Sequence, residues 1–407
     1  MRETAFPAAE NPQYPHNLRV RCRKPPREYP QPYPNTMKGS ISSGVLLVTA
    51  LLLAGCQTIS PDKAGLAPED ARTVARKAIP PNVKDAGGWA TDIQTSFSLL
   101  GLPATRGSLC ATVAVIEQES GFQVNPVVAG LPAIAWKAID ERAARYHVPG
   151  FMVRTALALP SGNGQSYAQR IDSARTEEDL SRTFEDLIDT VPLGKRLFGQ
   201  YNLVRIGGAM QVSISYAEDH AKRKSYPYGD ARSIRQEIFT RRGGLYFGIA
   251  HLLDYPADYP EMKYRFADYN AGHYASRNAA FQRALAVATG QKLTPDGDLL
   301  DHANPSMATP GQTERAARTF GKQIGQNDDS IRAMLQKGDT LAFADTPLYK
   351  AAFAHADRAG SGKPMPRAIL PDIQLNSPKI TRKLTTAWFA ERVNERYLRC
   401  LKRVGGE

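Results

Sequence analysis

The sequence predicts an all-α protein. Apolar residues recur at spacings of three and four along most of the chain, which is the period of a helix with one buried face. Few stretches alternate apolar and polar residues as a half-buried strand does, and no internal repeat is visible. With 407 residues, 42% of them hydrophobic and 23% charged, the chain is globular and long enough for one large or two ordinary domains.

Residues 37–55 predict a signal peptide. Met37 and Lys38 precede a small polar stretch and an apolar run at 45–54 that is too short to span a bilayer. Because a cleaved signal acts from the N-terminus, we expect translation to begin at Met37 and residues 1–36 to be a mis-assigned upstream leader. A functional cytosolic extension is the alternative.

The signal ends in Leu53-Ala54-Gly55-Cys56. This order resembles the lipobox of bacterial lipoproteins, which implies diacylation of Cys56, removal of everything before it and attachment to the membrane through the lipid. Gln57 resembles the sorting signal for the outer membrane, so the protein would face the periplasm from there. The alternative is an ordinary secretory signal with an accidental cysteine.

The chain has four cysteines, and two remain after Cys22 is assigned to the leader and Cys56 to the lipid. Cys110 and Cys400 would lie in an oxidising envelope, so we expect a disulfide between them. Two buried thiols are the alternative, because free cysteine packs as a small hydrophobe.

The helices expected before residue 126 lead to a central one. A helix is expected at 68–79, and an amphipathic helix at 89–100. Ser108 is expected to cap the next helix, which is apolar on most sides and therefore central in its domain. That helix should end near Glu119, with Gly121 as its terminator.

The later helices follow the same periodicity. They are expected at about 131–146, 151–159, 177–188, from 213 onward, and at 246–253, 265–269, 279–289, 312–324, 330–336, 347–357 and 379–403. A tether and short helix at 56–88 would precede the main domain at 89–290. The Pro-, Gly- and Asp-rich stretch at 291–310 marks the start of a helical C-terminal extension at 291–407.

The chain lacks the motifs of several enzyme classes. The seven histidines lack metalloprotease spacing and no cysteines lie close together, so no metal site is predicted. Asp296, Asp298 and Asp301 do not fit a calcium loop and indicate a solvated turn. There is no nucleophile elbow and no phosphate loop, so no cofactor is expected. The net charge of +12 favours anionic partners, but in a secreted chain it does not predict nucleic acid.

Three separated clusters carry the chemical signal: Glu119-Ser120-Gly121, Gly208-Ala209-Met210-Gln211 and Tyr269-Asn270-Ala271-Gly272. In this order they resemble the lytic transglycosylases of the lysozyme-like superfamily, whose cores carry Glu-Ser-Gly, Gly-Leu-Met-Gln and Ala-Tyr-Asn-Ala-Gly. The resemblance covers roughly residues 89–290 in pieces. It implies a lysozyme-like core with a helical insertion at 126–200.

The family's roles transfer only to matching positions. By that resemblance Glu119 takes the place of the catalytic acid. The substrate-binding positions that it implies are Ser120, Gly208, Met210, Gln211, Tyr269 and Asn270. The chain departs from the family at Ala209, where leucine is usual, and at Asp268, where alanine usually precedes the tyrosine. Gln211 also follows Glu119 by 92 positions (211 − 119), far more than in compact members, and it is open whether the insertion walls the cleft or blocks it.

The implied activity is cleavage of peptidoglycan glycan strands between N-acetylmuramic acid and N-acetylglucosamine. A single glutamic acid suffices where the acetamido group of the sugar acts as the nucleophile. The acid protonates the glycosidic oxygen and then, as a carboxylate, takes a proton from the sugar 6-hydroxyl, which gives a 1,6-anhydro end. Such an acid must stay protonated near neutral pH, and apolar burial favours that state.

Each cluster also has a purely structural interpretation: a surface Glu-Ser pair, core packing and a helix C-cap. The competing functional hypothesis is therefore a catalytically inactive envelope lipoprotein that binds glycan or acts as a scaffold for a transport or secretion complex. The insertion and the extension at 291–407 favour it. The sequence predicts no particular protein partner.

Overall fold

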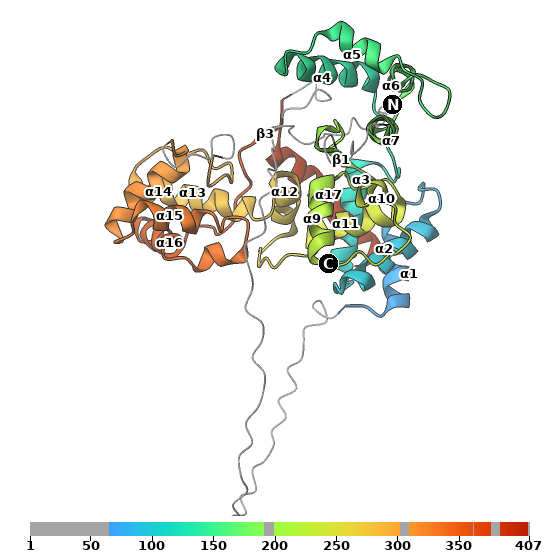
Figure 1. Ribbon diagram of the computed structural model, residues 1–407. Helices are drawn as coiled ribbons and strands as arrows, with labels where there is room; N and C mark the ends of the chain where they lie inside the picture. The colour runs from blue at the N-terminus through green and yellow to red at the C-terminus, as the bar shows by residue number, and fades with distance from the viewer. Residues whose placement is uncertain (1–64, 191–198, 302–308, 361, 376–382, 406–407) are drawn as a thin grey trace, which may run out of the picture.

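The computed structural model describes residues 65–190, 199–301, 309–360, 362–375 and 383–405 (Figure 1). Within these residues the fold is helical apart from two short pairs of antiparallel strands, which confirms the all-α class. No helix among them is long and apolar enough to cross a membrane. The predicted leader, signal peptide and lipid site at Cys56 lie outside the described residues.

The first and larger core surrounds α3. Its elements are α1 (Pro68–Ala78), α2 (Ala86–Leu100), α3 (Arg106–Glu119), β1 (Ile206–Gly207), β2 (Val212–Ser213), α9 (Ile214–Arg223), α10 (Ile234–Ile238), α11 (Arg241–Leu253), α12 (Met262–Ala271) and α17 (Thr386–Val404). Residues 109–116 of α3 are buried without interruption, as expected for a central helix. The last helix, α17, packs against both α3 and α12 (Figure 1).

The start of α3 corrects one prediction. The N-cap is Thr105 and not Ser108: Thr105 Oγ1 accepts from the backbone N of Ser108 at 3.0 Å, and Ser108 Oγ accepts from the backbone N of Thr105 at 2.8 Å. This reciprocal pair is a capping box, in which the second hydroxyl stands at the third helical position. The end of the helix is as predicted, with Gly121 at a positive φ of 59°.

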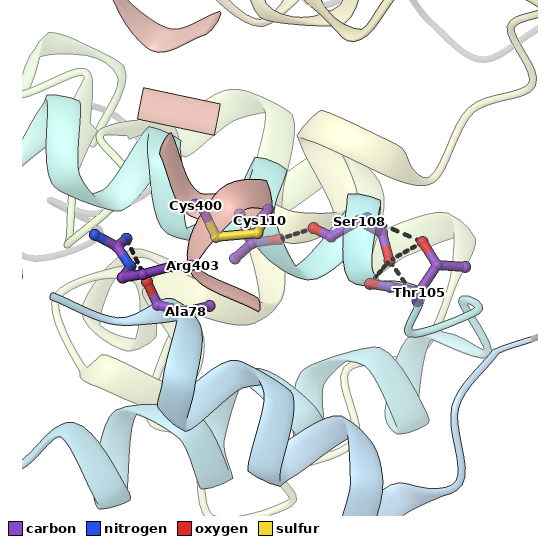
Figure 2. The surroundings of a disulfide bond; sticks show 7 residues. Ala78, Thr105, Ser108, Cys110, Cys400 and Arg403 are labelled. Carbon is purple, nitrogen blue, oxygen red and sulfur yellow. Dashed lines mark hydrogen bonds between the residues drawn. A yellow bond between two sulfur atoms is a disulfide. The ribbon is translucent and has the colours of Figure 1, made fainter. Parts of the chain in front are cut away.

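The predicted disulfide between Cys110 and Cys400 is confirmed, with an Sγ–Sγ distance of 2.01 Å (Figure 2). It joins α3 to α17 across 290 positions of sequence. Near the end of α17, Arg403 donates to the carbonyl oxygen of Ala78 in α1 at 2.6 Å (Figure 2). The last helix is therefore part of the same unit as the first three.

The second core is built from α13 (Ala275–Thr289), α14 (Gln312–Gln323), α15 (Asp328–Leu335), η2 (Leu341–Asp345) and α16 (Pro347–Ala359). These helices lie together at one side of the molecule (Figure 1). The packing does not follow the predicted boundary at 291, since α13 joins the second core and α17 joins the first. The chain returns through β3 (Gln374–Leu375) and β4 (Leu384–Thr385), so α17 begins at Thr386, later than predicted.

The intervening segment is helical as expected, but it has more helices than predicted. It contains α4 (Leu131–Arg145), α5 (Gly150–Leu157), α6 (Tyr167–Ser173), α7 (Glu177–Asp189) and η1 (Gly199–Tyr201). The unpredicted α6 begins with a capping box between Ser166 and Gln169. Among the described residues of this region, Ala135, Leu157, Tyr167 and Ile171 form a third and much smaller core.

Candidate functional site

Glu119 is the last residue of α3, and its side chain is 0% exposed. Neither carboxylate oxygen has a hydrogen-bond partner in the part of the chain that the structure describes. Burial raises the pKa of Glu119 well above its usual range; the charge of Arg396 opposes this shift and that of Glu177 adds to it. Burial therefore favours the protonated form of this carboxyl, which is the form that a general acid needs.

Glu117, two residues earlier, has different surroundings. Its Oε1 lies 3.6 Å from Arg396 Nε and 3.5 Å from Arg399 Nη2, and its side chain is partly exposed. Two arginines of α17 therefore compensate this acid, while the fully buried Glu119 has no such partner. The contrast favours Glu119 over Glu117 as the catalytic candidate.

Three more buried polar atoms, which lie within the predicted clusters or close to them in sequence, have no hydrogen-bond partner among the described residues. They are Gln118 Oε1, Asn125 Oδ1 and Asn270 Nδ2. With the two oxygens of Glu119, they belong to the end of α3, the loop after it and the end of α12. Buried polar groups in folded proteins are nearly always paired, so exceptions of this kind need an explanation such as a polar ligand.

The second cluster forms the turn between β1 and β2. Gly208 has φ of 75°, and a Cβ there would lie 2.2 Å from the carbonyl oxygen of Ile238, so only glycine fits. Gln211 is buried and has a positive φ of 50°. Its Nε2 donates to the carbonyl oxygen of Gly208 at 3.1 Å. A left-handed conformation is uncommon for a residue other than glycine, and such strain persists mainly where a site requires it.

The second and third clusters are in direct contact. Tyr269 is buried, and its hydroxyl donates to the carbonyl oxygen of Met210 at 2.6 Å. In turn, the carbonyl oxygen of Tyr269 lies 3.2 Å from His251 Nε2, and burial lowers the pKa of His251 to about 3. The imidazole is therefore neutral and donates through Nε2, which fixes the end of α12 against α11.

Asp268, which departs from the family pattern, has a structural role. Its carboxylate accepts from the backbone N of Tyr274 at 2.9 Å and of Ser276 at 2.7 Å, and from the hydroxyls of Tyr255 and Tyr259. These bonds satisfy backbone donors at the start of α13. They also explain why α13 begins at residue 275, four positions before its predicted start.

The structure adds two side chains of α17 to the site, and neither was among the site residues predicted from the sequence. Thr386 Oγ1 donates to Asn270 Oδ1 at 2.8 Å, and Arg396 lies beside the end of α3. These two positions are ten residues apart in α17, or about 15 Å along its axis. Asn270 therefore lies near the start of α17, and the end of α3 with Glu119 lies near Arg396, about three turns further along the same helix. The signal available in the sequence was the pairing of Cys110 with Cys400.

The site is closed in this conformation. The side chains of Glu119, Met210 and Gln211 are 0% exposed, and those of Ser120, Tyr269 and Asn270 are also buried. By the resemblance Met210 and Gln211 would line the cleft, and in this structure other parts of the chain cover both side chains. The predicted insertion contacts the loop after α3, because Asn125 Nδ2 donates to Oε2 of Glu178, in the first turn of α7, at 2.5 Å.

The other ionisable groups do not suggest a metal centre. In the five described segments, no group of three or more histidine, cysteine, aspartate or glutamate side chains could hold a metal ion. Asp296, from the predicted solvated turn, accepts from Gln282 Nε2 at 2.7 Å. That contact attaches the turn to α13.

The chain belongs to the family described as "Protein of unknown function (DUF1615)", whose model matches residues 82–403. That range contains all three clusters and α17 almost to its end. The chain is similar to the uncharacterized protein YaiW of Escherichia coli (strain K12), with 51% identity over 362 residues, which cover 88% of this chain and 98% of the relative. No solved structure matches the chain.

Proposed function

We propose that this protein is an outer-membrane lipoprotein that cleaves peptidoglycan glycan strands between N-acetylmuramic acid and N-acetylglucosamine. The observation that carries the proposal is Glu119, a fully buried carboxyl at the end of a central helix, which has no hydrogen-bond partner among the residues that the structure describes. Its raised pKa supplies the protonated acid that glycosidic cleavage requires. The contact between Tyr269 and Met210 supports it further, since it joins two of the clusters that resemble a transglycosylase.

In the proposed reaction, Glu119 donates its proton to the glycosidic oxygen as the bond to the anomeric carbon breaks. The acetamido oxygen of the same sugar attacks that carbon, so no second carboxylate is needed. The Glu119 carboxylate then takes the proton of the 6-hydroxyl, whose oxygen bonds to the anomeric carbon and displaces the acetamido group. The product is a 1,6-anhydro end, and Glu119 is again protonated.

The unpaired polar atoms suit a substrate of this kind. Asn270 Nδ2 is a buried donor without a described partner, and a carbonyl oxygen of an N-acetyl group is the acceptor it would take. Gln118 Oε1 is an acceptor in the same state, and a sugar hydroxyl could donate to it. Since the site is closed, glycan binding must displace part of the segments that cover Glu119.

One observation favours the second candidate function, a lipoprotein that binds glycan or acts as a scaffold without cleaving it. Complete burial of Glu119, with the first turn of α7 nearby, is what a site that no longer admits substrate would show. The two candidates differ in the product they leave on the glycan. They share the lipid anchor at Cys56.

Digestion of purified sacculi tests the activity. The form comprising residues 57–407 contains every described element and both disulfide cysteines. We expect it to release muropeptides with 1,6-anhydro ends, detected by mass spectrometry, and Glu119→Gln to release none. Glu117→Gln is the matched control and should retain activity, because that acid is paired with arginine.

The outcomes separate the two functions. Absence of products from the unmutated protein, together with its co-sedimentation with sacculi, would replace cleavage by binding. Products with reducing ends would identify a hydrolase. For the anchor, we expect radiolabelled palmitate to enter the full chain and to be lost with Cys56→Ser; equal labelling of both would contradict the lipid site.

A further inference from the structure

Large apolar side chains are exposed to solvent in the turn between α4 and α5 and in the first turn of α5. Tyr146 is 57% exposed, Val148 40%, Phe151 72% and Met152 52%. With Leu159, at 59%, they make up half of the ten exposed large hydrophobic residues in the described parts of the chain, although they span only positions 146–159. Exposed apolar residues are common when scattered, but a group of this size on one turn indicates an interaction surface.

The local fold explains why these side chains are uncovered. The helix α5 has eight residues, and only Leu157 among them is buried. The small core of the α4–α7 region offers little apolar surface to cover the rest. Figure 1 shows α4 and α5 at the edge of the molecule, away from α1 and from the second core. The turn is thus a projecting apex.

The sequence around this apex carries positive charge. Between Glu141 and Asp172 the sequence contains four arginines and no acidic residue. Arg154 pairs with Asp140 at 2.8 Å and Arg170 with Asp186 at 2.7 Å, both outside that interval. Arg145 precedes Tyr146 directly, is exposed, and has no ion pair among the described residues. The apex therefore combines apolar side chains with uncompensated positive charge.

We propose that the α4–α5 apex docks on an anionic lipid bilayer. Phe151 and Met152 would enter the boundary between headgroups and acyl chains, and Tyr146 would lie at headgroup level, where amphipathic aromatic rings are favoured. Arg145 would contact lipid phosphates. At about 12 Å, α5 is too short to span the bilayer and would lie at its surface. This inference does not depend on the catalytic proposal.

The small number of exposed apolar side chains at the apex favours a bilayer over a protein partner. A stable protein interface buries about 800 Å² on each side, which four side chains on a narrow turn cannot supply. A bilayer instead adapts its shape to a small group of side chains, and each apolar side chain that enters it contributes its own favourable free energy of transfer. The lack of acidic residues is also the charge complement of anionic headgroups.

Vesicle co-sedimentation of the form comprising residues 57–407 tests the proposal, since this form lacks the predicted lipid anchor. We expect binding to vesicles of phosphatidylglycerol and phosphatidylcholine, and little to phosphatidylcholine alone. The double variant Phe151→Ser with Met152→Ser should bind at least about tenfold more weakly. Arg145→Gln should bind about fivefold more weakly and depend less on salt.

Leu341→Ser is the matched control, because Leu341 is 47% exposed in η2, far from the apex in sequence. It should bind vesicles like the unmutated protein, and circular dichroism should show that every variant is folded. In addition, Phe151→Trp should show quenching of its fluorescence by brominated lipids. Failure of the unmutated protein to bind anionic vesicles, or equal binding by the double variant, would overturn the proposal and favour a protein partner for the apex.

Discussion

Glu314 and Glu119 are both buried glutamates, but they differ in whether other side chains pair with the carboxyl. Glu314, in α14, is 1% exposed and pairs with Arg318 at 2.6 Å and with Arg332 at 2.7 Å. Glu119, in α3, is 0% exposed and has no hydrogen-bond partner among the described residues. A buried carboxyl without a partner costs stability, and proteins retain such costs mainly where a site needs them.

Asp268 extends the comparison to a third buried acid. It belongs to α12, next to Tyr269, yet its carboxylate accepts four hydrogen bonds. Position near the proposed site therefore does not by itself leave an acid unpaired. The difference is specific to Glu119, and the following predictions test it in order of decreasing effect.

Removal of the disulfide should have the largest effect. Replacing Cys110 and Cys400 by serine opens a loop of 290 positions, which should lower the free energy of unfolding by about 5 kcal/mol. The loss should fall on the core that holds Glu119, because both cysteines lie there. Hydrogen exchange should rise more in α3 and α17 than in α14 and α16. Equal increases in the two cores would show that α17 does not hold the site together.

The substitution Glu314→Gln should come next. Removing this charge takes away the buried acid that Arg318 and Arg332 share, while Arg318 keeps the exposed Asp328 at 3.0 Å; the change should cost about 3 kcal/mol in chemical denaturation. The matched control is Asp329→Asn, an exposed acid in the neighbouring helix α15, which should change stability little. A cost as small as that of the control would mean that the paired glutamate is not structural.

Thr386→Val should have an intermediate effect. It removes the hydroxyl that donates to Asn270 Oδ1 and leaves a buried carbonyl oxygen unpaired, which should cost about 1 to 3 kcal/mol. If the proposed site binds glycan, sacculus binding should weaken as well, because Asn270 is no longer held in place. Thr386→Ser keeps a hydroxyl and should retain most of both properties; equal losses in both variants would show that the hydrogen bond is not the cause.

Much of this organisation was predictable from the sequence. Periodicity and caps located most helices, and the two cysteines left after the signal predicted the disulfide that is now confirmed. The short helices α6 and α10 were missed, because few residues carry too weak a period. The pairing of Cys110 with Cys400 indicates that the last helix lies beside α3, but the position of Arg396 beside the end of α3 was not predictable from local patterns. Closure of the site also depends on packing that local patterns do not encode.

At low pH, Glu119→Gln should change the free energy of unfolding less than the other substitutions do. Near neutral pH it should raise the free energy of unfolding, whereas Glu314→Gln should lower it. Since burial raises the pKa of Glu119 in the folded state, its stabilising contribution is complete below the unfolded-chain pKa, about 4.3, and is lost as the pH rises through the folded-state pKa. The variant lacks this dependence. It should therefore match the unmutated protein at low pH and become the more stable of the two as the pH rises.

Chemical denaturation of both proteins over a pH series gives this difference directly, because groups common to the two cancel. Glu117→Gln serves as the control, since that acid is partly exposed and lies beside two arginines. A Glu119→Gln variant that is less stable than the unmutated protein at every pH would show that the carboxylate has a partner in solution.

The protonation state of Glu119 is the most direct test of its proposed role as a general acid. Infrared difference spectroscopy between the unmutated protein and Glu119→Gln, recorded at neutral pH, isolates the carbonyl stretch of this one side chain. We expect the band of a protonated carboxylic acid in the unmutated protein, and this band should disappear only when the pH is raised further. A carboxylate band at neutral pH, with titration in the ordinary range of glutamate, would contradict this role.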